Sequence, residues 1–151
     1  SDELSEVELV DAIGALAAER PAGDPAAAFE RASARDSAGL ETEAEPLYRA
    51  ALAGGLDAVR RPRAVIQLAS TLRLLGRLDE SRELLEAELE RAGEPDALTD
   101  ETRAFLALTL LAAGEPERAA ALALTALAPH LSRYNRAVEG NAAELAERQS
   151  L

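Results

Sequence analysis

The chain has 151 residues, which is enough for one domain with a hydrophobic core, and its net charge is −12. This charge argues against binding to nucleic-acid phosphates and to anionic membranes. The absence of cysteine and lysine excludes disulfides, zinc-thiolate sites, thiol nucleophiles, Walker phosphate loops and Schiff bases. Aromatic residues make up only 3% of the chain, and no alternating run of β-branched residues indicates a strand. The composition therefore predicts an all-α protein whose core is packed by Ala and Leu.

No part of the sequence has the roughly twenty consecutive apolar residues that a membrane span requires, and no segment resembles a targeting signal. We therefore expect a cytoplasmic location. The chain begins with Ser1 and contains no methionine, which indicates a trimmed chain or a fragment.

The first helices are indicated by apolar spacing and by their end signals. Apolar residues three or four apart predict a leading helix over residues 1–20, ended by Pro21 and Gly23. Asp24 followed by Pro25 is typical of a helix start, with the aspartate as N-cap.

Further along the chain, the same signals predict three antiparallel helix pairs and one trailing helix: residues 24–55, 61–93, 98–128 and 131–149. In the second pair we expect Asp79 to cap the second helix. One side of the trailing helix is expected to be apolar: Leu131, Tyr134, Val138, Ala142 and Leu145. The prediction is about eight helices in a single domain, residues 1–151.

Three glycines recur at spacings of 37 and 38 residues, and their neighbours recur with them: Gly39, Gly76 and Gly114. A small residue lies five positions after each glycine (Ala44, Ser81, Ala119). An alanine lies seven positions before each glycine (Ala32, Ala69, Ala107). A fixed period of this size predicts a repeat array, in which each unit buries its apolar face against the next. We expect the glycines to be turn residues, and the leading and trailing helices to cover the ends of the array.

Helix pairs that turn on glycine, with small residues where they cross, resemble tetratricopeptide repeats. The segments that carry the resemblance are Ala28–Leu52, Val65–Leu89 and Arg103–Leu127. Arg31, Arg35, Glu88 and Arg103 depart from the apolar or small residues of the family pattern. The stretch DSAGLETEAEPLYRAAL looks like bacterial domains from GC-rich genomes. The resemblance implies a right-handed α–α superhelix that binds peptides or proteins and has no chemistry of its own.

The search for catalytic or metal-binding groups finds little. His130 is the only histidine; it follows Pro129 at a helix junction, with no nucleophile or carboxylate motif beside it, so we expect a capping or solvated role. The acidic runs 41–45 and 86–90 are interpreted as exposed faces paired with arginines. We expect no catalytic residue, metal or cofactor, and an all-α enzyme is kept only as a remote alternative.

The resemblance implies that the first helix of each pair lines a concave binding groove. The residues that would contact a peptide or partner helix there are Phe29, Ser33, Asp36, Arg63, Ile66, Ser70, Arg73, Leu108 and Leu111. Arg63 and Arg73 would accept carboxylates through bidentate hydrogen bonds.

Three alternatives stay open. The two arginines could instead pair internally with Asp36 or Glu101, and the trailing helix could cover Leu108 and Leu111. A homodimer through a flanking helix is the rival function.

Overall fold

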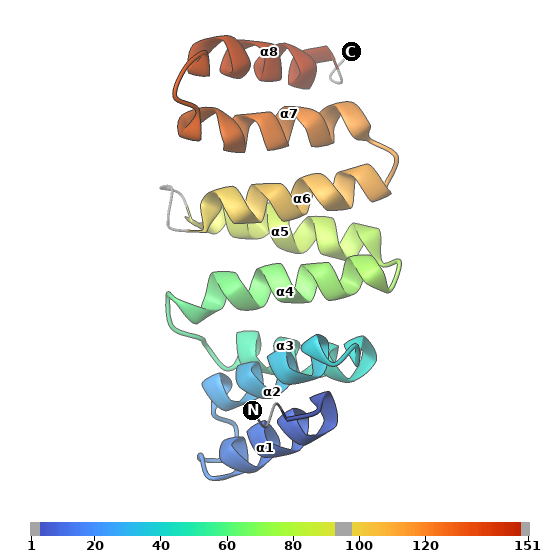
Figure 1. The fold of residues 1–151 in the computed structure, drawn as a ribbon, viewed down its shortest axis with the longest axis vertical. Helices are drawn as coiled ribbons and strands as arrows, with labels where there is room; N and C mark the ends of the chain where they lie inside the picture. The colour runs from blue at the N-terminus through green and yellow to red at the C-terminus, as the bar shows by residue number, and fades with distance from the viewer. Residues whose placement is uncertain (1–3, 93–97, 149–151) are drawn as a thin grey trace. The chain divides into compact units, whose positions relative to one another are not determined.

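The computed structural model describes residues 4–92 and 98–148, and it divides the chain into two compact units, Ser1–Leu75 and Gly76–Leu151. Unit 1 contains α1 (Glu6–Ala18), α2 (Pro25–Ser37), α3 (Glu41–Ala53) and α4 (Arg60–Leu74) (Figure 1). Unit 2 contains α5 (Leu78–Ala92), α6 (Thr99–Ala112), α7 (Pro116–Leu127), the short 3₁₀ helix η1 (Ala128–His130) and α8 (Asn135–Arg148). These eight α-helices, with no strand in the described ranges, confirm the all-α prediction.

Several predicted boundaries are corrected by the structure. Asp79 is not an N-cap, because α5 already begins at Leu78 and the aspartate lies in its first turn. The trailing helix begins at Asn135, so Tyr134 precedes it and is 77% exposed rather than part of an apolar stripe. The segment between the predicted helix pairs 61–93 and 98–128 lies outside the described residues.

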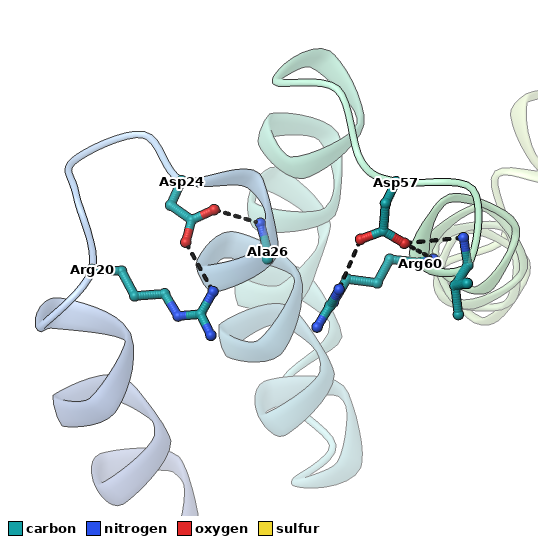
Figure 2. A network of polar contacts seen from close by, with 6 residues as sticks. Arg20, Asp24, Ala26, Asp57 and Arg60 are labelled. Atoms are coloured by element: carbon teal, nitrogen blue, oxygen red, sulfur yellow. Dashed lines mark hydrogen bonds and ion pairs between the residues drawn. The ribbon is translucent and has the colours of Figure 1, made fainter.

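Carboxylates fix two of the helix starts in unit 1 (Figure 2). Asp24 accepts a hydrogen bond from the backbone N–H of Ala26 at 3.1 Å and pairs with Arg20 at 3.2 Å. Asp57 accepts bonds from the backbone N–H groups of Val59 and Arg60 at 3.0 and 2.8 Å. Each aspartate therefore satisfies helix-start N–H groups that have no partner within the helix.

In unit 1, α3 packs on α2, and α4 packs on α3 while also contacting α2. The centre of this packing is the aromatic pair Phe29 and Tyr48, whose ring centroids lie 6.3 Å apart. Small residues stand where α2 and α3 cross, and Ala32 and Ala44 are fully buried. The absence of a bulky side chain at these positions lets the helix backbones approach closely.

In unit 2, α6 packs between α5 and α7, and α8 packs on α7. Ala107 and Ala119 are buried at the α6–α7 crossing, as the repeat pattern predicts. Ser81 replaces alanine at the matching position of α5, and its buried hydroxyl lies 3.0 Å from that of Thr109. The polar departure from the repeat is therefore satisfied by a polar partner on the facing helix.

The three repeated glycines are turn residues, as predicted. Gly39, Gly76 and Gly114 have φ of 71°, 77° and 79°, a left-handed conformation that side-chain-bearing residues rarely adopt. A Cβ built on any of them meets nothing within 4 Å. Glycine is therefore required at these turns for its backbone conformation and not for space.

Gly114→Ala should lower the free energy of unfolding of unit 2 by about 1–2 kcal/mol, because alanine is strained at φ 79°. Gly140 lies inside α8, where an added Cβ also meets nothing within 4 Å. Gly140→Ala is thus the matched control and should stabilise by about 0.5–1 kcal/mol. Urea denaturation followed by circular dichroism measures both; equal effects of the same sign would contradict the turn assignment.

Candidate partner-binding surfaces

A strongly apolar groove lies between α6 and α7 in unit 2. Its volume is about 480 Å³, and it is lined by Ala104, Ala107, Leu108, Leu111, Pro116, Ala119, Ala120 and Ala123. No lining side chain carries a hydrogen-bonding group. Leu108 and Leu111 remain 44% and 57% exposed at this groove. We call this surface the α6–α7 groove.

The trailing helix does not cover the two leucines. Among the described residues, α8 contacts α7 and η1 but has no contact with α6. Leu108 and Leu111 lie on α6 and therefore stay accessible. The alternative in which the trailing helix fills this surface is wrong.

The α7 side of the groove was missed by the sequence analysis. Pro116, Ala120, Ala123 and Leu127 follow one another at intervals of four, three and four residues, which places them on one face of α7. Leu127, at the end of this row, is 49% exposed. The spacing could have shown the row, but alanine is equally typical of a core position, so the pattern alone does not tell which face is open.

The predicted residues of unit 1 form a more closed surface. Phe29 is 1% exposed and Ile66 is 8% exposed, so both belong to the core and neither can be an open apolar contact for a partner. The Arg63 guanidinium lies over the Phe29 ring, 5.4 Å from its centroid, and covers it. Ser33 and Ser70 are half-buried. The structure thus corrects the expectation that Phe29 and Ile66 line an open groove.

A polar cluster joins α2, α3 and α4 in unit 1. The Tyr48 hydroxyl lies 3.2 Å from Asp36 Oδ2 and 2.7 Å from Gln67 Oε1, and the Thr71 hydroxyl lies 3.1 Å from Asp36 Oδ1. One hydroxyl proton of Tyr48 cannot be donated to two acceptors. The arrangement is satisfied if a protonated Asp36 donates to Tyr48, or if Gln67 turns its amide nitrogen toward Tyr48.

The pKa values in this cluster are shifted in the direction that favours neutral groups. Burial raises the pKa of Asp36, against the opposing effect of its hydrogen bonds from Thr71 and Tyr48. Burial, followed by the nearby Asp36 carboxylate, also raises the pKa of Tyr48. The cluster therefore holds α2, α3 and α4 together most favourably when Asp36 is uncharged.

Within the described part of unit 1, Arg63 and Arg73 form no ion pair. Asp36 is held by Tyr48 and Thr71 instead. The Nε atom of Arg73 is buried without a hydrogen-bond partner in the described residues. The alternative in which the arginines pair with Asp36 is therefore wrong, whereas pairing with Glu101, which belongs to unit 2, stays a prediction.

His130 does have a carboxylate beside it, contrary to the sequence analysis. Its Nε2 lies 2.8 Å from Asp100 Oδ2, and Arg103 pairs with the other oxygen of Asp100 at 2.9 Å. The hydrogen bond from His130 lowers the pKa of Asp100. Asp100 is distant in sequence and lies in the first turn of α6, whereas His130 ends η1, so only the fold brings the pair together. Within the described residues no cluster of three metal-ligating side chains is present.

The comparison with protein families identifies the fold. A family model described as Tetratrico peptide repeat matches residues 25–145. The chain belongs to the tetratricopeptide repeat family. A search of curated proteins and a search of solved structures each give no match. Tetratricopeptide repeats are generally scaffolds for protein–protein interaction. Separately, no helix in the described part of this chain is long and apolar enough to cross a membrane.

The Asp36→Asn variant tests whether Asp36 is protonated in the polar cluster that joins α2, α3 and α4. Because the pKa of Asp36 is raised above its ordinary value of 3.8, protonation stabilises the fold fully below that value and less as pH rises through the folded-state pKa. Asparagine stays neutral, can donate to Tyr48 and can accept from Thr71. The unfolding free energy of the variant minus that of the wild type should therefore grow with rising pH and then level off. Denaturation series from about pH 4 to about pH 8 measure this difference.

Asp36→Ala is the control, since it leaves Thr71 and Tyr48 without this partner and should destabilise by about 1–3 kcal/mol. An Asn-minus-wild-type difference that shrinks as pH rises would contradict the raised pKa.

Proposed function

We propose that this tetratricopeptide repeat chain is a noncatalytic interaction module that binds a segment of a partner protein in the α6–α7 groove. The observation that carries the proposal is the exposure of Leu108 and Leu111 beside a floor of alanines. A contiguous exposed apolar surface on a soluble domain is typical of an interaction site. The groove offers shape and apolar contact but no nucleophile, acid or base, which supports binding rather than catalysis.

Arg63 and Arg73 would supply a charged contact on α4 in unit 1. Ten residues along a helix correspond to about 15 Å, so the two guanidinium groups would meet acidic groups that are well separated along a partner. Their lack of ion pairs within the described part of unit 1 supports this role, because a partner carboxylate would not have to displace one.

Leu108→Gln combined with Leu111→Gln should weaken binding of peptides selected on the wild-type chain from a random display library. Each leucine that becomes buried on binding contributes about 1.5–3 kcal/mol, so the dissociation constant should rise about tenfold or more. Fluorescence anisotropy with labelled selected peptides measures the change. Both leucines are largely exposed, so the double variant should keep its circular dichroism spectrum and thermal midpoint.

Val59→Gln is the matched control, because Val59 is 70% exposed and lies in unit 1, outside the groove. If every selected peptide binds the leucine double variant as tightly as the wild type, the groove is not the binding site. The same titration with Arg63→Gln and Arg73→Gln reports whether acidic peptides use α4.

A second candidate function is self-association through α1. This helix has no buried residue among those described, and Leu9 and Leu16 are 39% and 64% exposed. A spacing of seven residues places the two leucines on one face of the helix, two turns apart. A second copy could cover this face in a symmetric dimer.

Leu9→Gln combined with Leu16→Gln should turn such a dimer into a monomer, because it removes the apolar surface on which the dimer depends. Analytical ultracentrifugation over a concentration series measures the oligomeric state. Val7, which is 70% exposed on the opposite face of α1, gives the control Val7→Gln. A wild-type chain that stays monomeric at all concentrations would exclude this candidate.

A further inference from the structure

The α6–α7 groove occupies the same repeat position as a surface that is filled in unit 1. Counted from the turn glycines Gly39 and Gly114, the equivalents are easily read from the sequence. Ala104, Leu108 and Leu111 of α6 match Phe29, Ser33 and Asp36 of α2, and Ala123 of α7 matches Tyr48 of α3. Three of these four positions of unit 1 make the contacts that hold α4.

In unit 1, α4 lies along this surface and closes it. Arg63, near the start of α4, covers Phe29 near the start of α2. Thr71, two turns further along α4, reaches Asp36 near the end of α2 at 3.1 Å. The order of these contacts shows that α4 runs parallel to α2. The surface between α2 and α3 is thus built to receive one helix in one direction.

In unit 2 the equivalent surface has no helix on it. Within the described residues α8 contacts α7 and η1 but not α6, and the groove keeps a volume of about 480 Å³. Two large aromatic positions of unit 1 are alanines here, Ala104 and Ala123. The groove is therefore wider than its counterpart, and Leu108 and Leu111 are exposed along its α6 side.

The chemistry of the groove favours a helix over an extended chain as its occupant. Its lining has only Ala, Leu and Pro side chains, and the backbone groups of α6 and α7 are engaged within their own helices. An extended segment pressed against this surface would lose water from its N–H and C=O groups and find no partner for them. A helix satisfies those groups internally.

Charge decides between a second copy and a different protein. Glu101 lies one turn before Ala104 on α6, is exposed, and forms no hydrogen bond or ion pair within the described residues. No basic side chain lines the groove. A second copy would bring another net charge of −12 to this acidic rim, whereas a cationic segment would be attracted to it.

We propose that the α6–α7 groove receives one cationic amphipathic helix of a partner protein, lying parallel to α6 as α4 lies along α2. The inference rests on the proposed function of the groove and specifies its ligand. The helix places apolar side chains at positions i, i+4 and i+8 against Ala104, Ala123 and Leu111, in the places that Arg63, Gln67 and Thr71 hold in unit 1. A basic residue one turn before the first apolar contact meets Glu101.

The test uses synthetic alanine-based peptides of about 15 residues, long enough for partial helix formation in water. The probe has leucine at i, i+4 and i+8 and arginine one turn earlier. Replacing this arginine by glutamate should raise the dissociation constant about threefold to tenfold at low ionic strength, and less at about 0.15 M salt. A central proline should raise it about a hundredfold, because it breaks the helix. Fluorescence anisotropy measures each constant.

Two protein variants sharpen the charge assignment. Glu101→Gln should remove most of the preference for the arginine peptide over the glutamate peptide. Glu83→Gln changes an exposed glutamate on α5 and should leave the preference intact. Equal loss in the two variants would show that only the overall negative charge matters and would overturn the contact with Glu101.

Direction is tested by disulfide trapping, which is clean because the chain has no cysteine of its own. A cysteine at the N-terminus of the probe peptide should cross-link to Glu101→Cys and not to Ala112→Cys, at the other end of α6. Preferred cross-linking to Ala112→Cys would overturn the parallel orientation.

The outcomes separate this inference from the proposed function. If the Leu108→Gln and Leu111→Gln variant loses library-selected peptides while the proline probe binds as well as the helical one, the groove binds partners but not as helices. If that variant loses nothing, the proposed function itself fails. If the chain alone forms a dimer that the Leu108→Gln and Leu111→Gln variant abolishes, the occupant of the groove is a second copy, and the proposal of a cationic partner is wrong.

Discussion

Close approach of helices at small residues is the constraint on which each unit depends. Ala32 and Ala44 in unit 1 and Ala107 and Ala119 in unit 2 are buried where a pair of helices crosses. The left-handed glycine between the two helices reverses the chain within a few residues, so the pair forms locally and has no long loop to order. Bulky residues at these crossings would push the axes apart and uncover the rest of the interface.

A helix pair of this kind buries only part of its apolar surface, and the remaining groove needs a further helix. In unit 1, α4 fills the groove and forms specific hydrogen bonds there. Gln67 of α4 is hydrogen-bonded to Tyr48, and Thr71 of α4 is hydrogen-bonded to Asp36. Buried polar groups that must find their partners favour one register and one helix over others. In unit 2 the equivalent positions are apolar, and α8 contacts α7 and η1 but, among the described residues, not α6. The same repeat therefore yields a closed internal contact in one unit and an open surface in the other.

The repeat could be predicted from the sequence, but which helix faces stay exposed could not. The turn glycines and the small residues of the crossings could be predicted because a glycine at the turn and a small residue five positions later recur in all three pairs. Phe29 and Ile66 were assigned to an open groove because a helical spacing defines a face of a helix but not what packs against it. The Asp100–His130 pair could not be predicted from the sequence, because its members are 30 residues apart in the chain and meet only in the folded unit 2. Tyr134 continues the apolar spacing of the last helix, yet its backbone, at φ 67°, has not entered the helix.

The difference between the two grooves also limits how a partner can be recognised. A groove with Asp36 and Tyr48 discriminates through hydrogen bonds, because a helix without matching groups would leave them unsatisfied. The α6–α7 groove has no hydrogen-bonding side chain that a partner could leave unsatisfied. Its alanines and leucines can pack against any row of apolar side chains that fits its width. Discrimination at this groove must therefore come from what surrounds it. The exposed carboxylate of Glu101 and the net charge of −12 would weaken the binding of acidic helices and favour basic ones. In the proposed complex, the shape of the groove therefore selects a helix as the ligand, and the charge at its rim selects among helices.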